Sequence, residues 1–441
     1  MSLTKLSGAF VRSAAYERRF LAKNSWDLSM VVWIPLMTIL MVWWIFSQTQ
    51  ITDLPIGVMD QDNGPVANTA VRYLEASPTL TVRQLYYSDA EAKAAILQRD
   101  VYAIVVIPEN FSRNILSGKS APLILQVNAQ YGTHSGIIQT SVQAVAGTLS
   151  AGVKIQRLVK QGMAPAQAAI AYSPINIQRI SLFNAATNYQ QFLASTVIPA
   201  LLHILAMVIG ATTIGRELRD KKLGHWYRFI NQGHPHLLMV DEPASPTQAT
   251  LETAKTDTDK GFSPQSNVPN NGNEPVNLLV IFCGLLGKYF WPILAYSIWA
   301  MLALWLATPQ TSVTISSLMA TYIGLILLMM LSFWLGAIFT LGSFSLRMGL
   351  SSTAFISAPS YAFAGVTFPY IAISNSAKHW SNALPLTHYL KLHIAQLQMQ
   401  APVAVSLPIV YGLTLAATIA VSLTALLTKR ALARPERWGA R

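Results

Sequence analysis

The stretch LSMVVWIPLMTILMVWWIFS, residues 28–47, decides the fold class of this chain. It carries no charge over twenty residues, and a helix needs about 20 apolar residues to cross the hydrocarbon core of a bilayer. Five further stretches resemble it and also lack Asp, Glu, Lys and Arg: residues 192–214, 289–307, 318–341, 349–371 and 403–428. The sequence therefore predicts an α-helical polytopic membrane protein with six spans.

The composition supports this class. Of the 441 residues, 52% are hydrophobic and only 11% are charged, against roughly 25% charged residues in an average soluble domain. An ordinary soluble enzyme is therefore excluded. The single cysteine, Cys283, excludes an intrachain disulfide framework and a Cys-based zinc ribbon. The formal charge of +12 fits loops that face anionic lipid better than it fits nucleic acid.

The first apolar stretch has an alternative interpretation as a secretory signal. Its charged lead of 27 residues is long, the apolar run exceeds the usual length, and no A-x-A site follows. We interpret it as a retained span.

Lys and Arg set the predicted orientation. They gather before the first span, after the second and in the tail, residues 429–441, whereas the loop between the third and fourth spans has none. Positive residues stay in the cytoplasm, so we expect both termini there. Residues 48–191 and 374–402 then lie outside.

Residues 48–191 are long enough for a domain with its own core. Strand and helix signals alternate in the order β-α-β-α-β-α-β, and a long amphipathic helix over 135–161 follows. We expect an inserted extracytoplasmic α/β domain.

Residues 230–277 are rich in proline and polar residues without an apolar period, so we expect a disordered cytoplasmic loop, centred on 233–275.

Two motifs resemble phosphate-binding loops. SGKS, residues 117–120, has Arg113 where a phosphate-binding loop needs glycine, and a turn is the better interpretation. GLLGK, residues 284–288, lacks the Ser or Thr that would hold magnesium. We expect no ATPase activity in this chain.

Metal and catalytic signals are weak. DQDNG, residues 60–64, partly resembles a calcium loop but lacks its distal Glu, so a turn is favoured. The histidines have no HExxH spacing, and His203 in the second span is typical of a helix–helix hydrogen-bond partner. We predict no metal site, no catalytic residues and no enzyme.

The spans contain no acidic residues, although proton- or sodium-driven carriers usually need ionisable groups in the bilayer. Energy is therefore expected to enter from a cytoplasmic partner. Two basic stretches, residues 16–27 and 215–229, suit short helices at the membrane surface. Simple positive-inside anchors remain the alternative for both.

Four segments in order carry a family resemblance: LPIGVMDQDNGPVA (54–67), VIPENFSRNILSGK (106–119), GRELRDKK (215–222) and FAGVTFPYIAISNSAKHWSNALPLTHYL (363–390). Together with the N-terminal span, this set resembles the permease subunits of ABC type-2 exporters with a large periplasmic domain. Residues 233–275 depart from the family pattern, because this segment is longer and more polar than the usual link between the coupling helix and the third span.

The resemblance implies a multi-pass protein of the bacterial inner membrane that forms a dimer with itself or a paralogue. An ATP-binding-cassette ATPase would dock under each half and carry the ATP and magnesium, with no cofactor in this chain. The cargo would be a drug, lipid or glycan-like amphiphile. A periplasmic adaptor and an outer-membrane channel are possible further partners, and nucleic acid is not one.

The resemblance also assigns parts of the chain to roles. Residues 1–27 would form an interfacial helix with Glu17 and Arg18, and residues 372–400 a re-entrant external segment. Residues 215–229 would form a coupling helix that contacts the ATPase, with the following residues in it: Arg216, Glu217, Arg219 and Asp220.

Aromatic side chains near the span ends would suit an apolar cargo. The candidates for lining the pathway are Trp43, Trp44, Phe46, Phe192, Tyr361 and Phe363. Aromatic belts at the membrane interface are the alternative. Two other functions stay open: a secondary transporter, and a membrane-bound sensor with an extracytoplasmic ligand domain.

Overall fold

The computed structural model describes residues 3–172, 182–184, 187–232, 276–308 and 313–439. The chain divides into two compact units. One consists of Met1–Ser47 and Gln190–Arg441, and the other of Gln48–Tyr189. The predicted loop over 233–275 lies outside the described residues.

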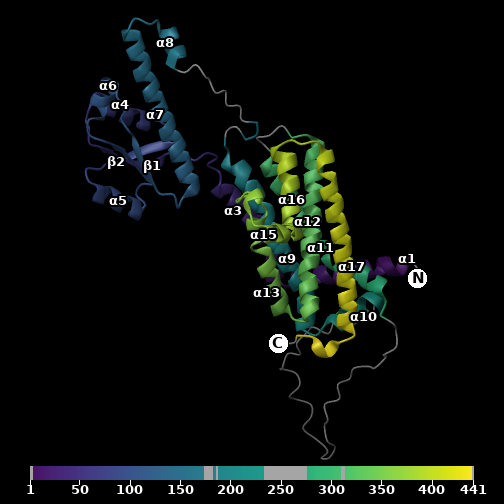
Figure 1. The fold of residues 1–441 in the computed structure, drawn as a ribbon. Helices are drawn as coiled ribbons and strands as arrows, with labels where there is room; N and C mark the ends of the chain where they lie inside the picture. Colours follow the sequence, from purple (N-terminus) through teal and green to yellow (C-terminus); the bar gives the residue numbers. More distant parts are fainter. Residues whose placement is uncertain (1–2, 173–181, 185–186, 233–275, 309–312, 440–441) are drawn as a thin grey trace, which may run out of the picture. The chain divides into compact units, whose positions relative to one another are not determined.

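The unit Gln48–Tyr189 has the predicted order of strands and helices (Figure 1). Its elements are β1 (Leu54–Asp60), α4 (Pro65–Glu75), β2 (Leu80–Leu85), α5 (Asp89–Gln98), β3 (Ala103–Ile107), α6 (Phe111–Leu116), β4 (Ile124–Val127), α7 (Gly132–Lys160) and α8 (Pro165–Tyr172). The sheet order is β2-β1-β3-β4, with β1 parallel to β2 and β3, and β4 antiparallel to β3.

The central strands are buried on both faces because helices cover both. Side chains alternate along β3, so that Ala103, Val105 and Ile107 join the core under α4, α6 and α7. Ile104 and Val106 join the smaller core under α5. This is the continuous apolar run that parallel strands require.

The other unit is a helical bundle. Its long helices are α9 (Ser195–Arg219), α11 (Leu278–Ala307), α12 (Ile315–Ser343) and α17 (Leu407–Leu432). Within the described residues, these four helices are long and apolar enough to cross a membrane, α9 together with the π-helical turn η1 (Gln190–Ala194) that precedes it. The helix pair α2 (Ser25–Val31) and α3 (Trp33–Ile45) adds a fifth span if it is counted as one.

The first predicted span is bent by 40° at Val32. Pro35 has no N–H, so the carbonyl of Val31, four residues earlier, loses its helical donor. The indole Nε1 of Trp299 donates to this carbonyl at 3.0 Å. A neighbouring helix thus satisfies the backbone group that the proline frees.

The predicted span over 349–371 is not one helix. It is divided into α13 (Leu346–Ser357) and α14 (Ser360–Phe363), and Gly365 follows with φ +79°. Pro359 explains the break, because its ring would clash with the carbonyl of residue 355 in a continuous helix. In the ranges that the structure describes, four helices, or five with the bent pair, are long and apolar enough to be spans, where the sequence predicted six.

The segment after the break folds back in short pieces. These are the 3₁₀ turn η3 (Tyr370–Ala372), α15 (Asn375–Ala383), α16 (Pro385–His393), the π-helical turn η4 (Ile394–Gln398) and the 3₁₀ turn η5 (Val403–Val405). A last 3₁₀ turn, η6 (Pro435–Arg437), follows α17.

Helices α9 and α12 cross at close range. A Cβ on Gly336 would lie 2.0 Å from the carbonyl oxygen of Met207, so only glycine lets the two backbones touch. Small residues are the usual means by which membrane helices approach this closely.

We predict that Gly336→Ala lowers the melting temperature of the purified protein, because α9 and α12 must separate, at a cost of about 1–3 kcal/mol. Gly342→Ala is the matched control on the same helix, since a Cβ there meets nothing within 4 Å. It should be neutral or stabilising, because alanine favours helix. Equal melting temperatures for the two variants would contradict the close crossing.

Candidate functional site

Four charged side chains are buried together at one end of the bundle. They are Glu17 of α1 (Leu3–Lys23), Arg216 and Glu217 of α9, and Lys288 of α11. Each is at most 5% exposed. Two positive and two negative charges make the cluster neutral, and we refer to these four residues as the charge cluster.

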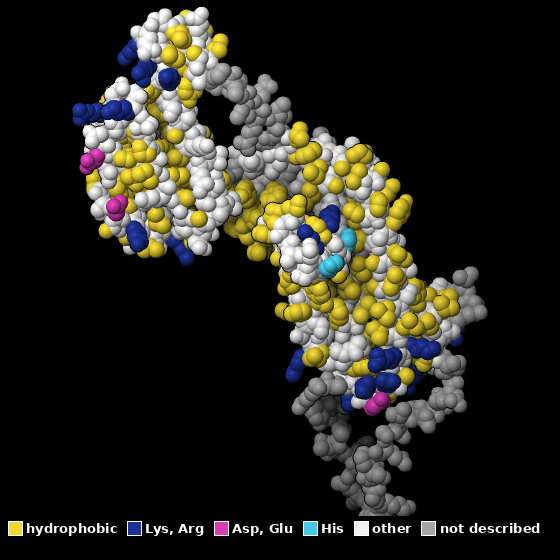
Figure 2. Space-filling model, in the orientation of Figure 1, with side chains coloured by type: hydrophobic (Ala, Val, Ile, Leu, Met, Phe, Trp, Pro, Cys, Tyr) yellow, Lys and Arg dark blue, Asp and Glu magenta, His cyan; other side chains and the backbone are white. Residues whose placement is uncertain are grey.

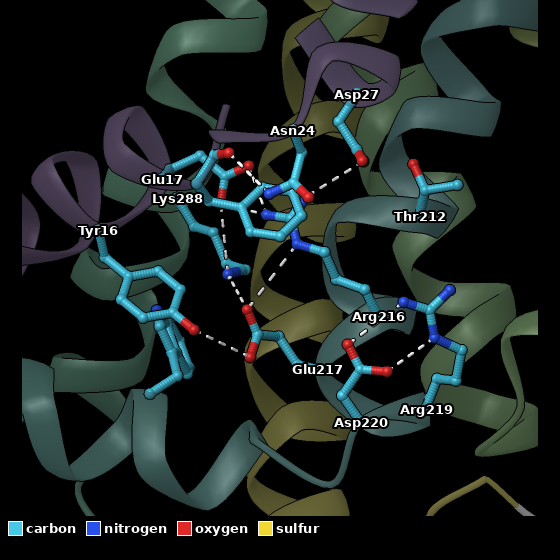
Figure 3. Close-up of polar contacts among 12 residues, drawn as sticks. Tyr16, Glu17, Asn24, Asp27, Thr212, Arg216, Glu217, Arg219, Asp220 and Lys288 are labelled. Atoms are coloured by element: carbon cyan, nitrogen blue, oxygen red, sulfur yellow. Dashed lines mark hydrogen bonds and ion pairs between the residues drawn. The ribbon is translucent and has the colours of Figure 1, made fainter. Parts of the chain in front are cut away.

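The four residues of the charge cluster contact one another, and Figure 3 also shows Tyr16 and Asp27 next to them. Arg216 donates to both carboxylate oxygens of Glu17. Lys288 Nζ donates to Glu217 Oε1 at 2.7 Å and lies 3.4 Å from Glu17 Oε2. Each basic side chain therefore contacts both acidic ones, since Arg216 Nε also lies 3.9 Å from Glu217 Oε1.

Aromatic rings surround the two cations. The guanidinium carbon of Arg216 lies 3.7 Å from the ring centre of Phe20, and Lys288 Nζ lies 4.9 Å from that of Tyr16 and 5.6 Å from that of Trp226. The hydroxyl of Tyr16 also donates to Glu217 Oε2 at 3.5 Å. Rings at these distances attract a cation that has lost its water.

Helix α1 can reach the cluster because α11 has a glycine beside Lys288. A Cβ on Gly287 would lie 2.2 Å from the carbonyl oxygen of Phe10. Next to this contact, the indole of Trp291 donates to the carbonyl of Ala14 at 2.9 Å. The two helices are therefore fixed on each other where the charges meet.

The segment predicted as one coupling helix, residues 215–229, belongs to two helices. α9 continues through Arg219, a turn follows in which Lys221 has φ +56°, and α10 runs over Leu223–Gln232. α10 is amphipathic and buries Leu223, Trp226, Phe229 and Ile230. Residues 230–232, which were predicted as loop, belong to this helix.

Helix α10 is also bonded to α1. Trp226 Nε1 donates to Ser13 Oγ at 3.1 Å, and Arg12 Nε donates to the carbonyl of Ile230 at 3.0 Å. The N-terminal helix thus connects α10 to the charge cluster.

The six residues predicted for coupling fall into two groups. Glu17, Arg216 and Glu217 are brought together in the charge cluster, where each is at most 5% exposed. Arg219 and Asp220 form an exposed ion pair at 2.8 Å, and Arg18 is exposed on α1. A charge reversal of Glu217 would therefore break a buried network, so the segment cannot be tested that way without disturbing the fold.

Lys288 was missed because the third span was predicted to begin at residue 289. The helix begins at Leu278 and places Lys288 inside it. The available signal was the apolar run on both sides of Lys288, since a lone charge in such a run is expected to have a buried partner.

The six aromatic residues predicted for the pathway do not share one site. Trp43, Phe46 and Tyr361 pack against the bundle core, and Trp44 is 75% exposed. The hydroxyl of Tyr361 is 2.9 Å from Thr196 Oγ1. Phe192 and Phe363 are half-buried.

The DQDNG segment forms a turn at the end of β1. Asp60 Oδ1 accepts the backbone N–H groups of Asp62 and Asn63 at 2.9 and 3.0 Å. Asp62 Oδ2 accepts those of Gly64 and Ser112. These carboxylates are used by the backbone, and no group of three or more His, Cys, Asp or Glu among the described residues could hold a metal ion.

His203 has the predicted role of a helix–helix partner, since its Nδ1 is 2.6 Å from Ser332 Oγ of α12.

Residues 26–228 match the family model described as ABC-2 family transporter protein. The match confirms the resemblance to permease subunits of ABC type-2 transporters. It ends at α10 and covers α2, α3, the α/β unit and α9. A search of curated proteins finds no match.

We predict that Lys288→Met strongly destabilises the protein, because Glu17 and Glu217 then share one cation in an apolar site. Loss of one partner from a buried ion pair costs about 3–5 kcal/mol. The measurement is the melting temperature in detergent, with the exposed Lys429→Met as the matched control.

Two more variants complete a double-mutant cycle with Lys288→Met. They are Glu17→Gln alone and Glu17→Gln combined with Lys288→Met. The double variant restores neutrality by leaving Arg216 with Glu217, so its loss should be smaller than the sum of the two single losses. Additive losses would show that the four charges do not act as one cluster.

Proposed function

We propose that this chain is the membrane-spanning permease subunit of an ABC exporter. It would move an amphipathic or apolar substrate, such as a drug, lipid or glycan-like molecule, out of the cytoplasm or the inner leaflet. A separate ATPase subunit would supply the energy. The observation that carries the proposal is the charge cluster, which joins an interfacial helix to two long helices of the bundle next to α10.

The charge cluster lies at the basic end of the bundle. Figure 2 shows Lys and Arg gathered at the end that carries α10 and the C-terminal end of α17. By the positive-inside rule this end faces the cytoplasm, which is where an ATPase is located.

We place the protein in the bacterial inner membrane, with a second permease copy or a paralogue beside it. A periplasmic adaptor and an outer-membrane channel would be optional partners.

The exposed turn between α9 and α10 is the proposed contact with the ATPase. Arg219, the last residue of α9, and Asp220, the first residue of the turn, have side chains that are 62% and 40% exposed. A force on this turn or on α10 reaches α1 through the Trp226–Ser13 and Arg12–Ile230 hydrogen bonds. From α1 it reaches α9 and α11 through the charge cluster. Arg18, exposed on α1, would lie on the same docking side.

An apolar groove supports the proposed class of substrate. It has a volume of about 660 Å³ and is lined by α12, α15, α16 and α17, including Leu331, Leu335 and Ile409. His388 and Asn382 are the polar side chains in its lining. Such a lining suits a mainly apolar molecule with one polar end.

The two alternative functions are a secondary transporter and a membrane-bound sensor. The charge cluster places ionisable groups inside the bundle, which a secondary transporter would need. In the charge cluster, however, all four groups are paired with one another. A sensor would not need the coupling contacts. Transport by the chain alone in proteoliposomes under a pH or sodium gradient, without ATPase, would favour the secondary transporter.

We predict that the purified chain neither binds nor hydrolyses ATP. In SGKS, Arg113 occupies the position of the required glycine, and GLLGK ends in a lysine that belongs to the charge cluster. Equilibrium binding of radiolabelled ATP should show no saturation, and saturable binding would contradict the proposal.

We further predict that exchanging the exposed pair, Arg219→Asp with Asp220→Arg, uncouples the complex. The swap is neutral in charge and leaves the charge cluster intact, so insertion and melting temperature should be unchanged. Substrate-stimulated ATPase activity and export should both fall by tenfold or more, an order-of-magnitude expectation for the loss of a charged contact.

The matched control is Glu436→Arg with Arg437→Glu, another exposed acidic–basic neighbour pair at the same end of the chain's bundle. It should keep normal export. Normal export by the Arg219 and Asp220 swap would favour the alternative that residues 215–229 only anchor the chain in the membrane.

A further inference from the structure

A second feature of the basic end is a pocket of about 880 Å³ beside the charge cluster. It lies between the C-terminal half of α1, the start of α2, the end of α9 and the start of α13. Its lining residues are Tyr16, Arg19, Phe20, Lys23, Asn24, Trp26, Asp27, Thr212, Arg216, Glu217, Arg219, Asp220, Lys222 and Leu346.

The pocket has more positive charge than its own carboxylates neutralise. Arg219 is paired with Asp220, and Arg216 and Glu217 belong to the charge cluster. Asp27 lies 3.6 Å from Arg216 Nη1. Arg19 and Lys23 form no ion pair with any carboxylate in the ranges that the structure describes. These two cations, one turn apart on α1, are available to an anion.

A buried donor at the pocket also lacks a partner. Arg216 is 5% exposed and lines the pocket, and its Nε has no hydrogen-bond partner among the described atoms. The nearest carboxylate oxygen, that of Glu217, is 3.9 Å away, which is too long for a hydrogen bond. A buried donor without a partner is costly, and an oxygen-rich anion in the pocket would remove that cost.

Exposed apolar side chains follow the pocket-lining residues along the chain on two sides. Trp26 at the rim is 72% exposed, and Trp33 and Met37 on α3 are 56% and 59% exposed. On the other side, Leu346 lines the pocket, and Met348 and Phe355 follow on α13, also exposed. A ligand with a phosphate in the pocket and long apolar chains would match both parts.

We propose that this pocket binds the phosphate of an anionic phospholipid from the leaflet at the basic end of the bundle. Arg19 and Lys23 hold the phosphate, Trp26 lies at the level of the headgroup, and the acyl chains run along α3 and α13. The proposal rests on the membrane placement of the proposed function, but it does not require the ATPase. A bound lipid would brace α1 against α9, next to the exposed turn.

The test uses the full chain, purified without ATPase, delipidated and placed in phosphatidylcholine nanodiscs. Fluorescent phosphatidylglycerol should bind saturably, and Arg19→Gln with Lys23→Gln should weaken binding by roughly 30-fold, since each cation near a membrane surface accounts for about a fivefold effect. The variant Arg19→Lys with Lys23→Arg keeps both positive charges, so it should bind phosphatidylglycerol as the parent protein does.

The matched control is Lys5→Gln with Arg18→Gln, which removes the same charge from α1 outside the pocket. It should leave phosphatidylglycerol binding unchanged. Equal losses for the two double variants would overturn the proposal, because they would show a general attraction of the helix to anionic lipid. All variants should keep the melting temperature of the parent protein, since the four replaced side chains are exposed or lie outside the charge cluster.

Two further measurements distinguish a phospholipid in the pocket from two other occupants, free phosphate and the ATPase. Competition by millimolar inorganic phosphate would show that the pocket takes free phosphate, and it would overturn the lipid assignment. If Arg19→Gln with Lys23→Gln abolishes ATPase docking while phosphatidylglycerol still binds, the pocket is a protein-docking surface and the proposal fails. Loss of lipid binding with ATPase docking retained is the expected result.

Discussion

Charge neutrality in a buried site is the constraint on which the basic end of this protein depends. Glu17, Arg216, Glu217 and Lys288 come from three helices, and each is removed from water. Any one of them left alone would be costly, so α1, α9 and α11 are held in one arrangement. Hydrogen bonds between α10 and α1, one donated from each side, add a fourth helix to this group. Within the described residues, the exposed turn after Arg219 is therefore connected to the bundle through buried ion pairs and hydrogen bonds.

Much of the fold was predictable because apolar patterning is local. The sequence of strands and helices along the α/β unit followed from short apolar runs between turn signals, and β3 is buried on both faces as its unbroken run indicates. Four of the predicted spans correspond to long helices for the same reason. The break at Pro359 was visible in the sequence, but tolerance of Pro199 and Pro292 within α9 and α11 shows that proline alone does not decide whether a span continues.

The candidate site was predictable only in part, because its pairing is tertiary. A search for stretches without charge necessarily ends at Lys288, and so it removes from the span the lysine that donates to Glu217 at 2.7 Å. The pattern GRELR also does not show that its first two charges face inward while Arg219 and Asp220 face water. That division follows from where α1 crosses α11 at Gly287, which no local pattern specifies.

The order of the cluster residues along the chain has a consequence for biogenesis. Lys288 lies ten residues after Leu278, the first residue of α11, or about 15 Å along the helix axis, and a lysine at depth is expensive to insert alone. Ribosomes deliver the N-terminal part of a chain first. Both glutamates and Arg216 are therefore synthesised before Lys288 emerges, so the lysine enters the membrane when its counter-charges are already present. Until then Arg216 can neutralise only one of the two carboxylates, and the arrival of α11 completes the neutral set.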